Sequence, residues 1–235
     1  MTVNSIYQSA LIVGAGDGLS ASVARVFAGK GMRIALAARN PGKLAKLAKE
    51  LGAHALECDV SDRAQVEKMF AQADEYFGAS PDVVVYNPSY RVRGPIVEVD
   101  PGDVAKALAV TAYGGFLVAQ QAAKRMVARG SGAILFTGAS ASIKGYPQSA
   151  AFAMGKFALR GLAQSMAREL APKGVHVAHF VIDGAIRNPS RVEPADAPDS
   201  MLDPDAIARS YLHVLEQDRS AWTWELELRP WVERF

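Results

Sequence analysis

The stretch S-A-L-I-V-G-A-G-D-G-L-S, Ser9 to Ser20, decides how the rest of this sequence is interpreted. A short apolar run, Ser9–Val13, leads at once into Gly14, Gly16 and Gly18 and then into a segment with helical spacing, Leu19–Gly29. A glycine-rich turn between a strand and a helix lets the backbone pass close to an anion, and it points the free N–H groups of the helix start toward that anion. The pyrophosphate of a dinucleotide is the usual occupant, although glycines can also serve only a tight turn.

The remaining sequence repeats this alternation of short apolar runs with longer helical segments. Apolar runs without polar alternation indicate strands that are buried on both faces, and strands that alternate with helices indicate a parallel sheet. The predicted strands are Ser9–Val13, Arg33–Ala37, Ala53–Glu57, Val83–Tyr86, Ala133–Thr137, Val175–Val181 and Thr223–Leu228. The predicted helices are Leu19–Gly29, Gly42–Leu51, Arg63–Phe77, Gly102–Ala128, Ala150–Ala171 and Pro204–Gln217. The pattern predicts an α/β fold with a doubly wound parallel sheet.

Length and composition fit one globular domain over residues 1–235. Half of the residues are hydrophobic, and 26 basic against 24 acidic side chains give a net charge of +2, so nothing favours a nucleic-acid partner. The single cysteine, Cys58, excludes an internal disulfide and fits a reducing, cytoplasmic location. No run is long enough for a membrane helix, the first residues lack the pattern of a secretory signal, and the four histidines lack metal-ligand spacing. We therefore expect neither a membrane nor a metal partner.

One segment, Asp183–Pro204, is predicted to be a loop. It contains Pro189, Pro194 and Pro198 and many polar residues, and it is longer than an ordinary connection. Such a loop indicates a lid over a site, with a disordered surface loop as the alternative.

The end of the second predicted strand indicates which dinucleotide binds. An acidic residue there would bind both ribose hydroxyls of NAD, but the sequence reads A-A-R-N, Ala37 to Asn40. Arg39 offers a cation to a 2′-phosphate, which favours NADP (NADPH) as the cofactor. The alternative is that Arg39 is a solvated surface arginine, and Asp17 adds a negative charge near the phosphate turn.

These motifs resemble those of the classical short-chain dehydrogenase/reductases over nearly the whole chain. The family's glycine motif is T-G-x-x-x-G-x-G; here Gly14 and Gly18 match, Val13 replaces the threonine and Ser20 replaces the last glycine. The resemblance implies a Rossmann-type domain that binds NAD or NADP. It also implies a homodimer or homotetramer, because the family uses the helix matching Ala150–Ala171 in a dimer interface.

The resemblance assigns further residues to the cofactor. Asp59 matches the acidic residue that contacts adenine, Asn87 is what remains of the family's N-N-A-G motif, and Gly184 and Ile186 match P-G-x-I-x-T. The complete set implied for the cofactor is Gly14, Gly16, Asp17, Gly18, Leu19, Arg39, Asp59, Val60, Asn87, Pro88, Lys156, Gly184 and Ile186.

The family's catalytic set is only partly present. Its tyrosine, the proton donor, and its lysine stand four residues apart on one helix face, and here these positions hold Phe152 and Lys156. Phenylalanine has no proton to give. The asparagine that holds a water in the family is replaced by Thr111.

The serine and the substitute proton donor are left open by the sequence. Ungapped spacing from Phe152 leads to Ala139, a one-residue deletion leads to Ser140, and Ser142 is a further option; we favour Ser140. Tyr146 is the nearest tyrosine that could replace the missing donor, unless it is a packing residue, and Tyr90 and Tyr113 are weaker candidates.

The sequence therefore predicts an NADP-dependent oxidoreductase of the short-chain class that acts on a small carbonyl or enoyl substrate with an altered proton donor. General acid catalysis supplies about 10²–10⁴-fold of the rate, so hydride transfer survives the loss of the tyrosine if another acid or a water protonates the product. The alternative is a catalytically weak or inactive NADP-binding protein with a regulatory or scaffold role.

Overall fold

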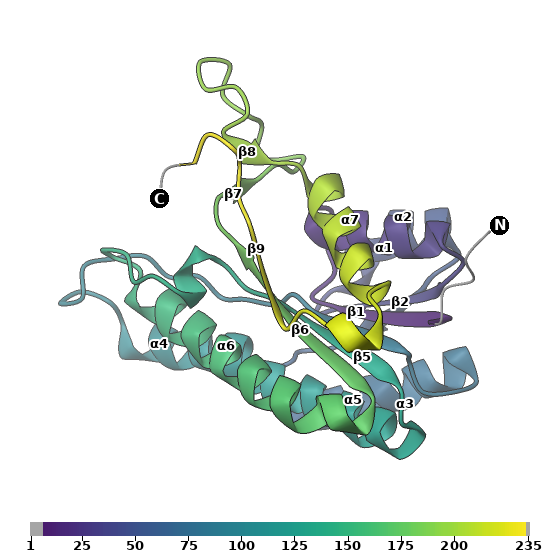
Figure 1. The fold of residues 1–235 in the computed structure, drawn as a ribbon. Coiled ribbons are helices and arrows are strands. Elements are labelled where there is room, and N and C mark those ends of the chain that lie inside the picture. The colour runs from purple at the N-terminus through teal and green to yellow at the C-terminus, as the bar shows by residue number, and fades with distance from the viewer. Residues whose placement is uncertain (1–6, 234–235) are drawn as a thin grey trace.

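A parallel sheet of seven strands runs through the computed structural model, which describes residues 7–233 (Figure 1). The strand order is β3-β2-β1-β4-β5-β6-β9, and every neighbouring pair is parallel. The strands are β1 Ser9–Val13, β2 Arg33–Ala38, β3 His54–Glu57, β4 Val83–Tyr86, β5 Gly132–Thr137, β6 Val175–Ile182 and β9 Glu225–Leu228. Their interior residues are almost all buried, as the uninterrupted apolar runs predict.

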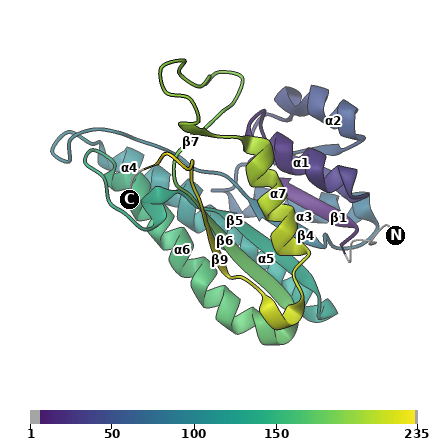
Figure 2. The ribbon, with the colours of Figure 1, turned by 45° about the horizontal axis from the view of Figure 1, so that its top comes forward.

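Helices cover both faces of this sheet, so the predicted doubly wound, Rossmann-type fold is confirmed (Figure 2). The helices are α1 Leu19–Gly29, α2 Ala45–Leu51, α3 Arg63–Phe77, α4 Pro101–Leu108, α5 Gly114–Arg129, α6 Ala150–Leu170 and α7 Pro204–Leu215. One apolar core joins the sheet to α1, α2 and α7, and a second core joins the opposite face to α3, α5 and α6.

The strand order reverses at β1, and this reversal positions the site. Strand β1 pairs with β2 on one side and with β4 on the other. The connections that leave the carboxyl ends of β1 and β4 therefore turn to opposite faces of the sheet, which opens a crevice between them.

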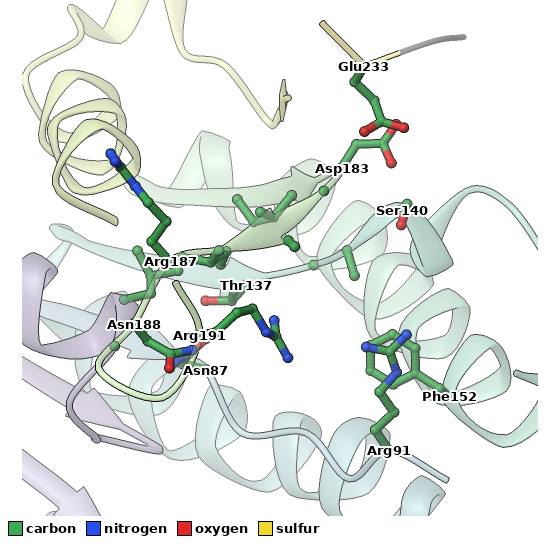
Figure 3. A pocket seen from close by; sticks show the side chains of 18 of the residues that line it. Asn87, Arg91, Thr137, Ser140, Phe152, Asp183, Arg187, Asn188, Arg191 and Glu233 are labelled. Atoms are coloured by element: carbon green, nitrogen blue, oxygen red, sulfur yellow. The ribbon is translucent and has the colours of Figure 1, made fainter. Parts of the chain in front are cut away.

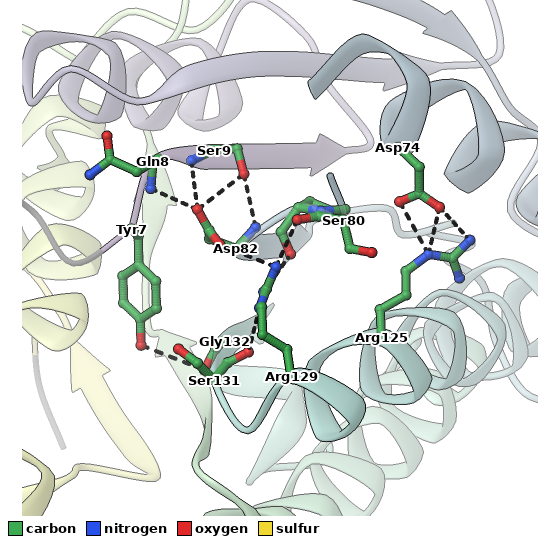
Figure 4. Close-up of polar contacts among 11 residues, drawn as sticks. Tyr7, Gln8, Ser9, Asp74, Ser80, Asp82, Arg125, Arg129, Ser131 and Gly132 are labelled. Carbon is green, nitrogen blue, oxygen red and sulfur yellow. Dashed lines mark hydrogen bonds and ion pairs between the residues drawn. The ribbon is translucent and has the colours of Figure 1, made fainter. Parts of the chain in front are cut away.

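The start of β1 is fixed by a carboxylate at the opposite end of the sheet (Figure 4). Asp82 Oδ2 accepts hydrogen bonds from the main-chain N–H groups of Gln8, at 2.7 Å, and Ser9, at 3.1 Å, and from the Ser9 hydroxyl, at 3.2 Å. Arg129 lies 3.3 Å from the other oxygen of Asp82. These contacts hold β1 in register beside β4.

The helix predicted over 102–128 is interrupted in the structure. Helix α4 ends at Leu108, a π-helical turn occupies Ala109–Tyr113, and α5 then continues to Arg129. The Tyr86 hydroxyl donates a hydrogen bond to the Val110 carbonyl oxygen at this turn. A local sequence pattern cannot reveal a contact between residues 24 positions apart, so the spacing predicted one uninterrupted helix.

The segment predicted as a loop, residues 183–204, is not wholly irregular. Two short strands, β7 Ala185–Ile186 and β8 Met201–Leu202, pair in parallel near its ends. Two-residue strands are too short to give a periodic signal. The part between them projects away from the sheet (Figure 1).

Other predicted boundaries differ by one to three residues. The last strand, for example, begins at Glu225 rather than at Thr223, and the helix predicted over 42–51 begins as a 3₁₀ turn, Pro41–Leu44. Residues 1–6, which hold most of the N-terminal stretch assessed for a secretory signal, and residues 234–235 lie outside the described part. None of the helices within residues 7–233 is long and apolar enough to cross a membrane.

Candidate functional site

The glycine turn after β1 is pinned to the end of β2. The main-chain N–H groups of Gly14 and Ala15 both donate to the Ala37 carbonyl oxygen, each at 2.9 Å. Gly14 has a φ of +79°, and a Cβ there would lie 2.7 Å from Pro88, so only glycine fits this position. A Cβ on Gly16 would meet no atom within 4 Å. The protein's own packing therefore does not require glycine at this position, whereas the close passage of a bound pyrophosphate would.

Helix α1 starts without a side-chain cap, since Gly18 stands at its N-cap and makes no side-chain hydrogen bond. The first N–H groups of the helix thus remain free for an anion. Ser20, which replaces the last glycine of the family motif, donates from its hydroxyl to the Gly14 carbonyl oxygen at 3.1 Å and accepts from Asn87 Nδ2 at 2.7 Å. Asn87, at the end of β4, is thereby fixed to the glycine turn.

A cavity of about 420 Å³, here called the turn cavity, lies against this glycine turn. It is closed by the ends of β2 and β3 and by the chain after β4. The predicted cofactor residues in its wall are Gly14, Gly16, Asp17, Arg39, Asp59, Val60, Asn87 and Pro88. Arg39 and Lys43 are exposed at its edge, and neither forms an ion pair within residues 7–233. Both cations are thus available to a phosphate.

Asp59 is a well-anchored carboxylate in the turn cavity. Its Oδ1 accepts hydrogen bonds from the hydroxyl of Ser61, at 2.6 Å, and from the Ser61 main-chain N–H, at 3.0 Å. These hydrogen bonds lower the pKa of Asp59. Asp59 therefore stays ionised and can act only as a hydrogen-bond acceptor toward a ligand.

A second cavity, here called the large cavity, has a volume of about 970 Å³ and shares Asn87 with the turn cavity (Figure 3). Its wall is formed by the start of α1, the chain after β4, the chain from the end of β5 to α6, and residues 182–188. The predicted site residues in its wall are Gly18, Leu19, Asn87, Ser140, Tyr146, Phe152, Gly184 and Ile186. The segment proposed as a lid therefore borders a cavity.

Phe152 contributes an apolar surface to the large cavity. The Arg91 guanidinium lies 5.1 Å from the centre of its ring, and Figure 3 shows the two side chains close together. The Lys156 ammonium lies 5.8 Å from the same ring centre. A cation over an aromatic face is a favourable arrangement. Phe152 thus lies near two cations in the place where the family has a tyrosine.

Lys156 is 3% exposed and lines neither cavity. Its ammonium donates to the Thr137 carbonyl oxygen at 2.7 Å, and Thr137 lies in the wall of the large cavity. Burial lowers the pKa of Lys156 to about 8. The lysine is therefore held directly behind the cavity wall.

Thr111 also lies outside both cavities, in the π-helical turn. It is 1% exposed, and its hydroxyl accepts from the Tyr90 main-chain N–H at 3.3 Å. A Cβ on Gly155 of α6 would lie 2.9 Å from the Thr111 Cβ, so the two helices touch here. Thr111 thus supports the chain after β4, and its assignment to catalysis stays a prediction.

The three alternatives for the serine differ in their surroundings. Ala139 has no hydroxyl, and the Ser142 hydroxyl is buried and accepts from the Ala139 main-chain N–H at 3.1 Å. Ser140 lines the large cavity. Of the two serines, Ser140 therefore has access to a ligand.

The three tyrosines also differ. Tyr146 lines the large cavity and is 44% exposed. Tyr90 lies in the wall of the turn cavity, and its hydroxyl donates to Asp103 at 3.0 Å, which raises the pKa of Tyr90. Tyr113 stacks on Phe116 and lines neither cavity. Tyr146 thus remains the tyrosine best placed to meet a substrate.

Sequence reasoning missed several cations at the site. Lys43 joins Arg39 at the turn cavity, four residues further along the chain. Arg91, Arg93 and Arg191 line the large cavity. The R-V-R run that follows β4 was a usable signal, because the chain beyond the carboxyl end of a strand next to the crevice lies near the site. Within residues 7–233 no group of histidine, cysteine and acidic side chains could hold a metal ion.

Comparison with known proteins adds independent information. A family model described as short chain dehydrogenase matches residues 8–191. D-threitol dehydrogenase from Mycolicibacterium smegmatis is 33% identical over 173 residues. That match covers 72% of this chain and 66% of the other protein, just under two thirds of its length.

Solved structures of the same kind superpose on nearly all of the chain. A short-chain dehydrogenase from Rhodopseudomonas palustris has a TM-score of 0.82 and 36% identity, with 95% of this chain and 99% of the other covered. An alcohol dehydrogenase from the archaeon Thermococcus sibiricus, complexed with 5-hydroxy-NADP, has a TM-score of 0.86 and 25% identity. That superposition covers 97% of this chain and 98% of the other.

Proposed function

This chain belongs to the short-chain dehydrogenase family of oxidoreductases, and we propose that it uses NADP(H) to reduce a small carbonyl or enoyl substrate with a proton donor other than the family's tyrosine. The observation that carries the proposal is that two neighbouring cavities share Asn87 in their walls. One is lined by the glycine turn and by two cations without an ion pair in residues 7–233, and the other is lined by Ser140, Tyr146 and Phe152.

The cofactor would be held mainly by main-chain groups and by two basic side chains. The uncapped start of α1 and the open space over Gly16 fit a pyrophosphate, and Asn87 and Asp59 offer polar groups to the rest of the dinucleotide. Arg39 follows the end of β2, where an NAD-selecting enzyme would carry an acid, and Lys43 lines the same cavity, which supports NADP. The chemistry that such a cofactor supplies when bound is hydride transfer.

The substrate's reacting group would meet the hydroxyls of Ser140 and Tyr146 in place of the hydroxyl of the family's catalytic tyrosine. Ser140 can donate a hydrogen bond to a substrate oxygen, and Tyr146 can supply a proton from the same side of the large cavity. Lys156 places a positive charge behind the wall through Thr137, which favours negative charge developing in front of it. Residues 182–188 form a further part of the wall, and we expect the loop beyond them to act as a lid.

Titration of the purified protein with NADPH and NADH tests the first half of this proposal. We expect tighter binding of NADPH. A screen of small ketones, diketones and enoyl compounds, monitored by NADPH oxidation with native, Ser140→Ala and Tyr146→Phe proteins, tests the second half. Turnover that is unaffected by either substitution would contradict the assigned roles.

One observation favours a second candidate, a weakly active or inactive NADP-binding protein. Phe152 cannot release a proton, and the Lys156 ammonium is engaged by a main-chain carbonyl behind the wall. NADPH binding without turnover on any carbonyl or enoyl compound would support this alternative.

Association of the chain with itself is the other part of the proposal. Four large apolar side chains of the α5–α6 region are each more than two-fifths exposed. They are Tyr113 in the turn before α5, Phe116 in α5, and Met154 and Phe157 in α6. Apolar side chains gathered on adjoining helices favour a homodimer, or a homotetramer with a further interface. Sedimentation analysis of native protein and of a Phe116→Asp, Phe157→Asp double variant tests this, with a monomeric variant expected.

A further inference from the structure

The large cavity contains more positive than negative charge. Arg91, Arg93, Arg187 and Arg191 lie in its wall, whereas Asp183 and Glu233 are its only acids within residues 7–233. Arg187 is neutralised by Asp203 at 2.8 Å, and Asp183 faces Lys144 at 3.4 Å. Three arginines without an ion pair in the described part of the chain thus remain against one carboxylate, that of Glu233.

Two of these arginines lie beside the groups that would act on a substrate. Arg91 and Arg93, on the chain after β4, line both the large cavity and an adjoining space of about 250 Å³. Ser140, Tyr146 and Phe152 line the same two spaces. A group bound between the two guanidinium groups would therefore contact the proposed catalytic surface.

The arginines influence one another electrostatically. Partial burial, and then the charges of Arg93 and Arg191, lower the pKa of Arg91. All three arginines are exposed, and an anion placed among these like charges would be attracted to each of them. A single guanidinium matches the two oxygens of a carboxylate through two parallel hydrogen bonds, and a second arginine in the same wall adds to the positive charge.

Arg191 belongs to a different part of the wall. It pairs through its main chain with Asn188, and the Asn188 Cβ would lie 3.7 Å from a Cβ on Gly18 at the start of α1. Its side chain lies between Asn87 and Arg91 in Figure 3, and Arg191 also lines a separate space together with Asp17 of the glycine turn. Its charge is therefore available to the phosphates expected at the glycine turn.

We propose that the large cavity takes a carboxylate-bearing carbonyl or enoyl substrate, whose anionic group is bound by Arg91 and Arg93. The inference rests on the proposed function and names its substrate class. The Phe152 ring then has a role in binding as well, because it contacts the Arg91 guanidinium and helps to hold it at the wall of the large cavity.

The test is calorimetric titration of the protein in the presence of saturating NADP⁺, so that no turnover occurs. The probes are 3-oxobutanoate and 4-oxopentanoate, each compared with its methyl ester. We expect the acids to bind and the esters to bind at least about 10-fold more weakly. An Arg91→Gln, Arg93→Gln double variant should lose about 10-fold or more of the affinity for the acids and none of the affinity for NADP⁺.

Arg209→Gln is the matched control, because Arg209 is an exposed arginine of α7 outside the large cavity. It should leave both affinities unchanged. Equal binding of acids and esters by the native protein, with NADP⁺ bound normally, would overturn the inference and leave the proposed function intact. Loss of acid binding in Arg191→Gln but not in the double variant would overturn the assignment to Arg91 and Arg93. If NADP⁺ does not bind at all, the proposed function fails. The acids and esters are then compared in cofactor-free protein, and equal affinities there would overturn the inference as well.

Discussion

The Arg91 guanidinium lies over the ring of Phe152, 5.1 Å from its centre, at the position one helical turn before Lys156. The two cations near this ring change what a hydroxyl at its tip would experience. A phenol near positive charge ionises more easily, because the charges stabilise the phenolate. The surroundings of Phe152 therefore remain suited to a tyrosine even though the tyrosine is missing.

Phe152→Tyr should create or raise NADPH-dependent reduction of carbonyl compounds. The added hydroxyl would lie in the wall of the large cavity near Lys156, so its burial need not leave it without a partner. The gain should be modest, about 10-fold, because catalytic groups act as a unit and Thr111 still replaces the family's asparagine. NADPH oxidation with a panel of ketones and keto acids measures the effect.

Phe157→Tyr is the control for that substitution, since Phe157 is an exposed phenylalanine on the same helix. It should not change the rate. Background rates for Phe152→Tyr on every carbonyl, with normal NADPH affinity, would show that the cavity has diverged beyond this one hydroxyl.

Arg39→Asp should reverse the preference between the two cofactors. An aspartate at the edge of the turn cavity would repel a 2′-phosphate and accept hydrogen bonds from the ribose hydroxyls of NADH. We expect NADPH affinity to fall by about 10–100-fold, the loss of one or two charge-assisted hydrogen bonds. Fluorescence titration with both cofactors checks this, and Lys43→Ala should give a smaller loss of the same sign. Equal NADPH and NADH affinities in the native protein would contradict the assignment of Arg39.

Lys156 should make the free energy of unfolding depend on pH in the alkaline range. Burial lowers the pKa of Lys156 from 10.5 to about 8. Below this value the side chain is charged in both the folded and the unfolded chain, and the folded state carries the full cost of the buried charge. Between the two pKa values only the unfolded chain holds the proton, so the contribution to the free energy of unfolding rises with pH, by up to about 3 kcal/mol.

Lys156→Met removes this contribution while keeping most of the apolar stem. The variant should gain most stability over the native protein near about pH 7, and its advantage should shrink as the pH approaches about 10. Urea unfolding of both proteins at several pH values measures the difference. A difference that does not change with pH would show that the ammonium is not desolvated as the structure indicates.

Asp82→Ala should destabilise the fold without touching the site. The substitution removes the acceptor for the Gln8 and Ser9 amides at the start of β1 (Figure 4). We expect a loss of about 2–3 kcal/mol in the free energy of unfolding, measured by urea denaturation. Asp74→Ala is the control, because among residues 7–233 the Asp74 carboxylate pairs with the partly exposed Arg125 alone, and its loss should cost about 1 kcal/mol or less. Similar losses for both variants would contradict an anchoring role for Asp82.

The sequence could predict those parts of the fold that depend on local periodicity. Leu11, Ile12 and Val13 form an uninterrupted apolar run, and such a run followed by glycines and a helical pattern can form only a buried strand, a turn and a helix. Residue spacing also placed Lys156 one turn after Phe152. It could not place the interruption at Ala109–Tyr113, because the Tyr86 hydroxyl that bonds to Val110 comes from a distant strand.

The sequence by itself determined the doubly wound fold, the glycine turn after β1 and the absence of a tyrosine at position 152. Only the tertiary structure decided which side chains share a cavity with that position. Arg191 is about a hundred residues from Arg91 and Arg93 in the chain, and all three line one cavity because β4 and β6 end at the same edge of a parallel sheet. The tertiary structure also decided that the Lys156 ammonium lies behind the cavity wall, bonded to the Thr137 carbonyl oxygen. It decided as well that Ser140 lines the large cavity, whereas the Ser142 hydroxyl is bonded to the main chain. Such choices depend on how loops cross the ends of strands, and no local pattern of residues encodes that path.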